Sequence, residues 1–133
     1  MRSRPVRVLV CDDDERFRKG LRLLLELDAR IEVVAEAANG EEAVKLAVLH
    51  RPDLVTMDIE MPVLDGVEAT KQLGRLLPEI KVVLVSSSEY AGRAEPAREA
   101  GAAAYVTKPR VFELLVEVVL AVARGEKFMR ATA

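Results

Sequence analysis

The sequence has little cysteine and little histidine: Cys11 and His50 are the only ones among 133 residues. A single cysteine excludes an internal disulfide framework, and its place in an apolar run favours a buried, inert thiol over a nucleophile. No apolar run approaches the roughly 20 residues that a membrane-spanning helix needs. The N-terminal letters MRSRP lead straight into a strand pattern, whereas a signal peptide would continue into a long apolar stretch. We therefore expect a cytoplasmic protein that makes no contact with a membrane.

Charge of one sign is also not in excess. The chain has 20 lysine and arginine residues against 22 aspartate and glutamate residues, which gives a formal net charge of −2. This balance gives no reason to expect nucleic-acid binding by this chain alone. Half of the residues are hydrophobic, and 133 residues are enough to bury one sizeable core. We therefore expect one globular domain.

Short runs rich in β-branched residues alternate with segments of helical period. The runs are nearly continuous in apolar character, as is typical of parallel strands buried on both faces; they cover residues 6–11, 31–37, 53–57, 81–86 and 102–107. Between and after them, helices are predicted over residues 15–27, 40–49, 66–77, weakly within 89–100, and over 111–124. The first helix places Phe17, Leu21, Leu24 and Leu25 on one face. Five βα units in one short domain predict an α/β, doubly wound parallel sheet.

Charged and hydroxyl side chains follow four of these five runs. Residues 12–14 are three consecutive aspartates after the first run, Asp58 follows the third, residues 86–88 are serines that end the fourth, and Lys108 follows the fifth. Ligands of open α/β sheets bind beyond the carboxyl ends of the strands, so we expect these side chains to share one crevice. Clustered carboxylates repel one another unless a cation lies among them. Mg2+ fits, because carboxylates and a phosphate group typically bind it together.

Each of these residues, taken alone, has an ordinary structural explanation. Consecutive aspartates more often cap a helix and charge its first turn than bind a metal ion, and we assign Asp14 to that capping role. Asp58 alone would be a loop acid, and Lys108 alone would be a surface lysine. Their joint placement favours a binding site, because the ordinary explanation has to account for each strand end separately.

Four segments together resemble the receiver domain of bacterial two-component response regulators. They are VLVCDD, DLVTMDIEMPVLDG, VVLVSSS and GAAAYVTKP, in the order and with the approximate separations of that family. The resemblance covers residues 6 to about 124. It implies a flavodoxin-like, five-stranded parallel sheet of strand order 2-1-3-4-5. We therefore predict a receiver domain over residues 1–124 and a short C-terminal tail over 125–133.

The resemblance implies a regulatory phosphoacceptor, whose only chemistry is self-catalysed phosphoryl transfer and autodephosphorylation. Asp58 would accept the phosphoryl group from a sensor histidine kinase or a histidine phosphotransfer protein. Asp12, Asp13, Asp58 and the main-chain carbonyl of Glu60 would bind Mg2+. These residues would form the acidic half of the site.

The resemblance also implies which residues would respond to the phosphate. Ser86, Ser87 and Lys108 would contact it, and Tyr105 would act with Ser86 as a switch by turning into the space that the serine leaves. Lys108 would pair with Asp58 or Glu60 before phosphorylation. A cis peptide bond before Pro109 would orient the lysine.

Two other functions share parts of the pattern. A haloacid-dehalogenase-like phosphatase also has an aspartate nucleophile after its first strand, in a D-x-D pattern that Asp12 and Asp14 satisfy. Such enzymes need a further acidic cluster downstream, but no aspartate follows Asp65. The main alternative is a detached receiver of a DNA-binding transcription factor, because AVARGEKF resembles the exit from the last helix of such regulators; residues 125–133 are too few for the DNA-binding domain. The segments DIEMP and VSSS also resemble receivers of chemotaxis methylesterases, so the output stays open.

The predicted helix over 111–124 is apolar over more than the stripe of about 100° that faces a core. Together with the strand over 102–107 and the weak helix within 89–100, it would form a surface for a second copy or an output protein. The alternative is that the tail folds back and covers the excess with Phe128 and Met129. Gly92 and Pro96 weaken the predicted fourth helix, and the proline favours a late start near Glu95.

Overall fold

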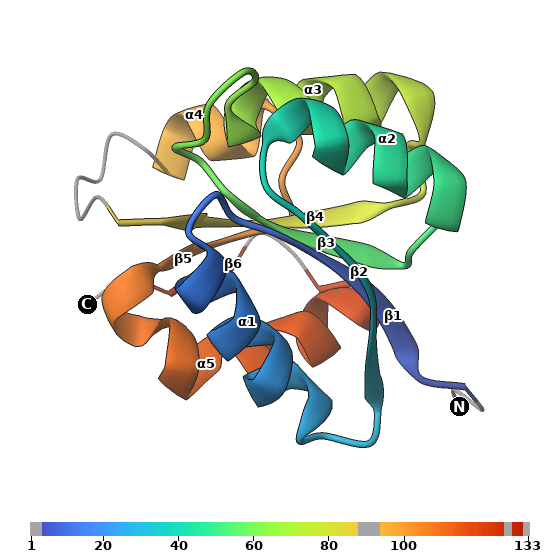
Figure 1. Ribbon diagram of the computed structural model, residues 1–133, viewed down its shortest axis with the longest axis vertical. Coiled ribbons are helices and arrows are strands. Elements are labelled where there is room, and N and C mark those ends of the chain that lie inside the picture. The colour runs from blue at the N-terminus through green and yellow to red at the C-terminus, as the bar shows by residue number, and fades with distance from the viewer. Residues whose placement is uncertain (1–3, 88–93, 127–128, 132–133) are drawn as a thin grey trace.

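The computed structural model describes residues 4–87, 94–126 and 129–131 (Figure 1). Its strands are β1 (Val6–Cys11), β2 (Ile31–Ala37), β3 (Leu54–Asp58), β4 (Lys81–Ser86), β5 (Ala104–Thr107) and β6 (Met129–Ala131). Its helices are α1 (Glu15–Glu26), α2 (Gly40–His50), α3 (Gly66–Leu76), α4 (Ala94–Glu99) and α5 (Lys108–Ala123).

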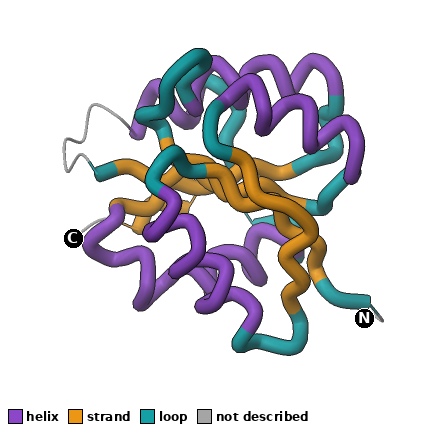
Figure 2. The backbone as a smooth tube through the Cα atoms, viewed as in Figure 1, coloured by secondary structure: helices purple, strands orange, loops and turns teal. Residues whose placement is uncertain are grey.

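The strands form one parallel sheet of order β2-β1-β3-β4-β5-β6. The predicted order 2-1-3-4-5 is therefore confirmed. β6 is an addition that we did not predict: it pairs with the outer edge of β5, in a register that places Ala104 opposite Met129. Helices α1 and α5 cover one face of the sheet, and α2, α3 and α4 cover the other (Figures 1 and 2).

One helix begins earlier than the sequence pattern predicted, and another begins as late as its proline predicted. α5 begins at Lys108, about one turn earlier than the predicted 111, because Thr107 is extended at the N-cap position and Pro109 is tolerated in a first turn. Lys108 thus belongs to the helix. α4 covers residues 94–99 with Pro96 in its first turn, which agrees with the late start that the proline predicted. Gly92 and Ser88 lie outside the described residues.

Helix caps fix the positions at which the chain leaves the sheet edge. The Asp14 carboxylate accepts hydrogen bonds from the main-chain N–H groups of Arg16 and Phe17, which confirms its predicted capping role. Asn39 and Asp65 cap α2 and α3 in the same way. Each cap satisfies amide groups that the first helical turn would leave unpaired. The loops after β1 and β3 are therefore short and anchored at both ends.

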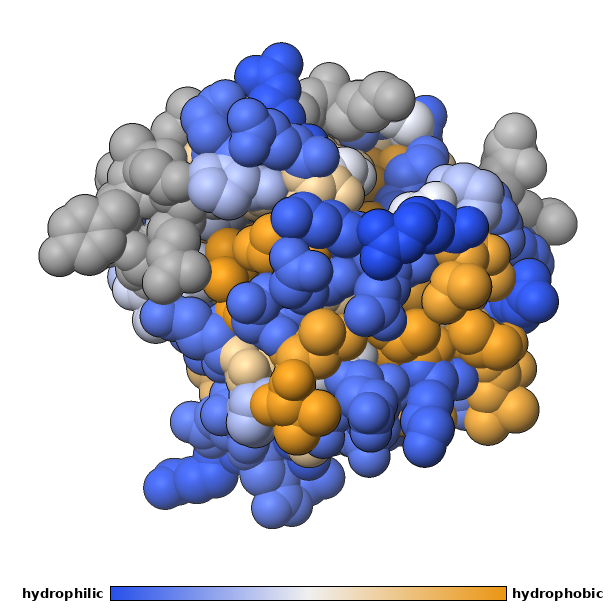
Figure 3. Space-filling model, turned by 90° about the horizontal axis from the view of Figure 1, so that it is seen from above, coloured by the Kyte–Doolittle hydropathy of each residue, from blue (hydrophilic) through white to orange (hydrophobic). Residues whose placement is uncertain are grey.

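The core consists of two apolar clusters, one on each face of the sheet. Valine and leucine side chains of β1, β3, β4 and β5 pack against α1 and α5 on one side and against α2, α3 and α4 on the other. This arrangement explains why the strand runs are nearly continuous in apolar character. The α2–α3 side shows a largely hydrophilic outer surface with smaller apolar areas (Figure 3), to which Val48, Leu49 and Leu76 contribute exposed side chains. None of the helices in the described ranges has the length and apolar character needed to cross a bilayer.

Most of the apolar surface predicted on the last helix is packed in the core. The buried side chains of α5 are Val111, Leu115, Val118, Val119, Ala121 and Val122. Phe112 is its one large apolar side chain counted as exposed, at 52%. Phe128, which the fold-back alternative invoked, lies outside the described residues, and Met129 belongs to β6.

Candidate functional site

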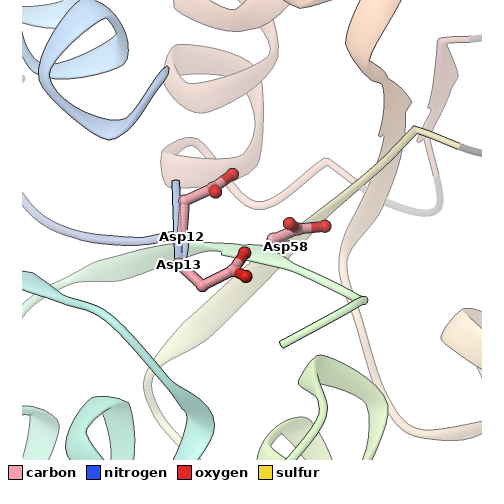
Figure 4. Close-up of side chains that lie close together, drawn as sticks. All are labelled: Asp12, Asp13 and Asp58. Atoms are coloured by element: carbon pink, nitrogen blue, oxygen red, sulfur yellow. The ribbon is translucent and has the colours of Figure 1, made fainter. Parts of the chain in front are cut away.

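Sheet register brings the predicted carboxylates together. Cys11 of β1 pairs with Met57 of β3, so the residues that follow, Asp12 and Asp58, end neighbouring strands. Oxygen atoms of Asp12, Asp13 and Asp58 lie within 4.8 Å of one another, and the three side chains project into the same region (Figure 4). Asp12 and Asp58 are only 1% and 3% exposed, whereas Asp13 is open to solvent. The predicted acidic cluster is therefore present, with one of its members at the surface.

Lys108 is the cation that compensates this cluster. Its Nζ lies 3.2 Å from an oxygen of Asp58 and 3.2 Å from an oxygen of Asp12. The pair with Asp58 was predicted, and the pair with Asp12 was not. A lysine in the first turn of α5 thus joins the carboxyl ends of β1 and β3.

Burial and mutual repulsion alter the ionisation of this group. Burial, followed by the charge of Asp12, raises the pKa of Asp58 to about 6, although Lys108 opposes the shift. Burial also raises the pKa of Asp12. Burial alone would lower the pKa of Lys108, but the charges of Asp58 and Asp12 outweigh it and raise that pKa. The site therefore has more negative charge than one lysine neutralises.

Arg18, to which we assigned no role from the sequence, binds the main chain of the acidic loop after β1. The Arg18 guanidinium donates to the main-chain carbonyl of Asp12 at 2.8 Å and to the Glu36 carboxylate at 2.8 Å. Burial opposes ionisation of Glu36, but hydrogen bonds from Arg18 and Arg22 outweigh it and lower its pKa. The main-chain N–H of Asp14 donates to the Asp12 carboxylate, which further fixes that side chain. Arg18 thus fixes the main chain at Asp12, and the N–H of Asp14 orients the Asp12 carboxylate.

Gly66 lets the start of α3 approach the backbone of Asp58. A Cβ atom at this glycine would lie 2.2 Å from the Asp58 carbonyl oxygen, closer than any real contact. The Gly66 N–H donates to the carbonyl of Ile59, and the N–H of Glu60 donates to the Asp58 carboxylate. The loop after β3 therefore folds tightly around the end of the strand, and only glycine fits at position 66, where α3 begins.

The predicted hydroxyl residues lie at the ends of β4 and β5. Ser86 is buried and pairs in register with Thr107, whose buried hydroxyl has no hydrogen-bond partner among the described residues. Ser87 donates to the Glu60 carboxylate at 2.7 Å, a bond between the β3 and β4 loops. Tyr105 is already buried, at 1% exposure. The roles of these side chains toward a phosphate, and the cis bond before Pro109, stay predictions.

Two further side chains border the site. Cys11, at the end of β1, is free and buried, as predicted, and burial followed by the charges of Glu42 and Asp12 raises the pKa of its thiol. The ring of Phe17, in the first turn of α1, lies under Lys108, with 4.4 Å between the ring centroid and Nζ. The sequence placed Phe17 on the apolar face of its helix but gave no signal for this contact.

The donor set fits a hard divalent cation. Carboxylate oxygens are the ligands that Mg2+ prefers, and it is usually bound through one or two of them with water completing the shell. Three such groups converge here, two of them buried and one exposed, on the side of the site open to solvent.

Comparison with known proteins assigns a family to this arrangement. Residues 8–120 match the family model described as response regulator receiver domain. The chain is 40% identical to the transcriptional regulatory protein LiaR of Bacillus subtilis over 91% of this chain and 57% of that protein. It is also 42% identical to a protein-glutamate methylesterase/protein-glutamine glutaminase of Halalkalibacterium halodurans, over 90% of this chain and 37% of that protein.

A solved structure shows the same fold. The signal receiver domain of the response regulator NarL from Mycobacterium tuberculosis superposes with a TM-score of 0.89 at 32% identity, over 92% of this chain and 99% of that one. The chain spans about half the length of the transcriptional regulators that it matches.

Proposed function

Because this chain belongs to the response regulator receiver domain family, we propose that Asp58 is its phosphoacceptor and that a sensor histidine kinase or a histidine phosphotransfer protein is the donor. Receiver domains are regulatory parts of two-component systems. The observation that carries the assignment is the placement of Asp58 at the buried end of β3, in contact with Lys108 and next to two further carboxylates.

Asp58 has the properties that a nucleophile needs here. With a pKa of about 6 it is mostly ionised at pH 7, so no general base has to remove a proton. Its carboxylate oxygen forms a bond to phosphorus while the bond from phosphorus to the donor's imidazole nitrogen breaks, and the electron pair of that bond leaves with the imidazole. Lys108 stays beside the transferring oxygens and stabilises their charge.

Asp12, Asp13, Asp58 and the main-chain carbonyl of Glu60 would bind Mg2+. Bound Mg2+ neutralises negative charge on the donor and on the carboxylates, which lets an anionic phosphoryl group approach. The proposal is supported by the three carboxylates, for which Lys108 is the single cation within ion-pair distance in the described part of the chain.

The output is proposed to run through the surface of α4, β5 and α5. Ser86, Ser87 and Lys108 would close on the phosphoryl oxygens, and Tyr105 would adjust with them, which shifts an existing equilibrium between two states. A second copy of the chain or an output protein would bind the altered surface. Such a partner would meet β6, because β6 pairs with the outer edge of β5.

The test is labelling by a small phosphodonor. Wild-type protein incubated with acetyl phosphate is expected to gain one phosphoryl group at Asp58 only when Mg2+ is present, as read by mass spectrometry after trapping of the acyl phosphate. Asp58→Ala is expected to remain unlabelled. Asp14→Ser is the matched control, because it removes a neighbouring carboxylate but keeps an N-cap side chain. Equal labelling of Asp58→Ala and wild type, or labelling that a chelator does not affect, would overturn the assignment.

A further inference from the structure

Among the described residues, three groups are recorded close to the Lys108 ammonium group, and two of them are acids. Asp12 and Asp58 each lie 3.2 Å from Nζ, and the ring of Phe17 lies 4.4 Å away from it, measured to the centroid. A cation over the face of an aromatic ring within about 6 Å is attracted by the ring's negative face. The lysine side chain is 22% exposed, so the contact is partly shielded from water.

Phe17 is itself held in place from two sides. Its main-chain N–H donates to the Asp14 cap, which fixes the start of α1. Its ring packs edge-to-face on Phe112, with 5.7 Å between centroids and 82° between planes. Phe112 lies one turn after Lys108 on α5, so that the ring of Phe17 contacts two residues of the same helix face. Gly20, about one turn after Phe17 on α1, also lies beside Phe112: an added Cβ there would be 3.4 Å from the Phe112 ring.

The lysine needs such support because its stem is flexible. Four rotatable bonds separate Nζ from the backbone, so the ammonium group can adopt many positions. Its two acidic partners would also bind Mg2+, so Lys108 would have to exchange these partners during the reaction. The aromatic face is a partner that no cation or phosphate competes for. It keeps the ammonium group at the site whichever oxygen the group contacts.

We infer that Phe17 is a positioning residue that keeps Lys108 at the acidic site during phosphoryl transfer. The inference rests on the proposed function of Asp58 and Lys108. It differs from a packing role, in which Phe17 would only fill the space between α1 and α5.

The test is a double-mutant cycle on labelling by acetyl phosphate. Phe17→Leu is expected to slow the maximal labelling rate at saturating Mg2+ by about threefold to tenfold, the range given by a cation–π contact of this exposure. In a Lys108→Ala background the same change is expected to have no further effect, because the residue it positions is gone. Replacement of Phe17 by pentafluorophenylalanine keeps the ring shape but reverses its charge distribution, and is expected to slow labelling like Phe17→Leu. Phe17→Trp is expected to retain the wild-type rate.

A spectroscopic readout separates positioning from packing. The ring under Nζ should displace the NMR signals of the Lys108 ε-methylene protons; the displacement is expected to vanish in Phe17→Leu and to persist in Phe17→Trp, which keeps an aromatic face below the ammonium group. Equal slowing by Phe17→Leu in both backgrounds, unmoved Lys108 signals, or a wild-type rate with the fluorinated ring would overturn the inference. If Lys108→Ala alone left the rate unchanged, the assignment of Lys108 in the proposed function would fail instead.

Discussion

Replacing Asp58 with asparagine is expected to stabilise the magnesium-free protein at neutral pH. Burial and the charge of Asp12 raise the pKa of Asp58 to about 6 in the folded state, against about 3.9 for an unperturbed aspartate. A group whose pKa is higher in the folded state contributes stability below its unfolded pKa and loses that contribution as pH rises through its folded pKa. At pH 7.5 the charged carboxylate therefore opposes folding, and the neutral amide does not.

The magnitude follows from the size of the shift. A difference of about two pKa units corresponds to roughly 3 kcal/mol between the two protonation states. The raised pKa already includes the favourable charge of Lys108, so the expected gain is about 1–3 kcal/mol in the free energy of unfolding at pH 7.5. Below about pH 4 the carboxyl group is protonated in both states, and the two proteins should differ little.

The assay is urea denaturation of wild type and Asp58→Asn at several pH values between 4 and 8, in the presence of a chelator. Added Mg2+ is expected to stabilise wild type more than the variant, because the variant has lost one ligand. Asp28→Asn is a control of opposite sign: hydrogen bonds from Arg30 lower the pKa of Asp28 to about 2, so this variant should lose stability at neutral pH. An Asp58→Asn variant no more stable than wild type at pH 7.5, or an advantage independent of pH, would refute the electrostatic explanation.

Three further predictions test other contacts. Gly66→Ala is expected to lower the free energy of unfolding by about 1–3 kcal/mol, because its Cβ would meet the Asp58 carbonyl. Gly74→Ala, with open space around it, should raise the free energy of unfolding by about 0.5–1 kcal/mol in the same urea denaturation experiment. Glu36→Gln should cost about 1–2 kcal/mol at pH 7, and the cost should fade as pH falls through the lowered pKa of the carboxylate; a cost that is independent of pH would contradict this. Beryllofluoride, a mimic of the phosphoryl group, is expected to change amide exchange over β5 in wild type, and Lys108→Ala should lose this change. An identical change in both proteins would exclude Lys108 as the residue that transmits phosphorylation to β5.

The sequence was sufficient for five of the six described strands and for the identity of the clustered carboxylates. Strand and helix periods alternate clearly, and parallel topology places every strand's carboxyl end at one edge, so Asp12, Asp13 and Asp58 could be brought together without coordinates. The cap at Asp14 was predictable for the same kind of reason, since it depends on local geometry alone.

Contacts that depend on how helices pack against each other were not predictable. Arg18 and Phe17 are ordinary residues of an amphipathic helix, and their roles depend on β2 and α5 lying beside α1. The predicted last helix began at 111 and left out Pro109, although proline suits the first turn in which the structure places it. β6 was missed because three residues are too short for a periodic pattern.

Because Cys11 is buried, the rate at which its thiol is chemically modified reports local opening of the protein. The chain's single thiol lies at 2% exposure in β1, immediately before the aspartates proposed to bind Mg2+, and its raised pKa keeps it in the unreactive protonated form. An alkylating reagent can therefore modify it only in molecules in which the end of β1 has become exposed to solvent. The rate of thiol modification thus measures how often this edge of the sheet opens, with no label introduced, and it can be followed as the acidic site is filled or emptied.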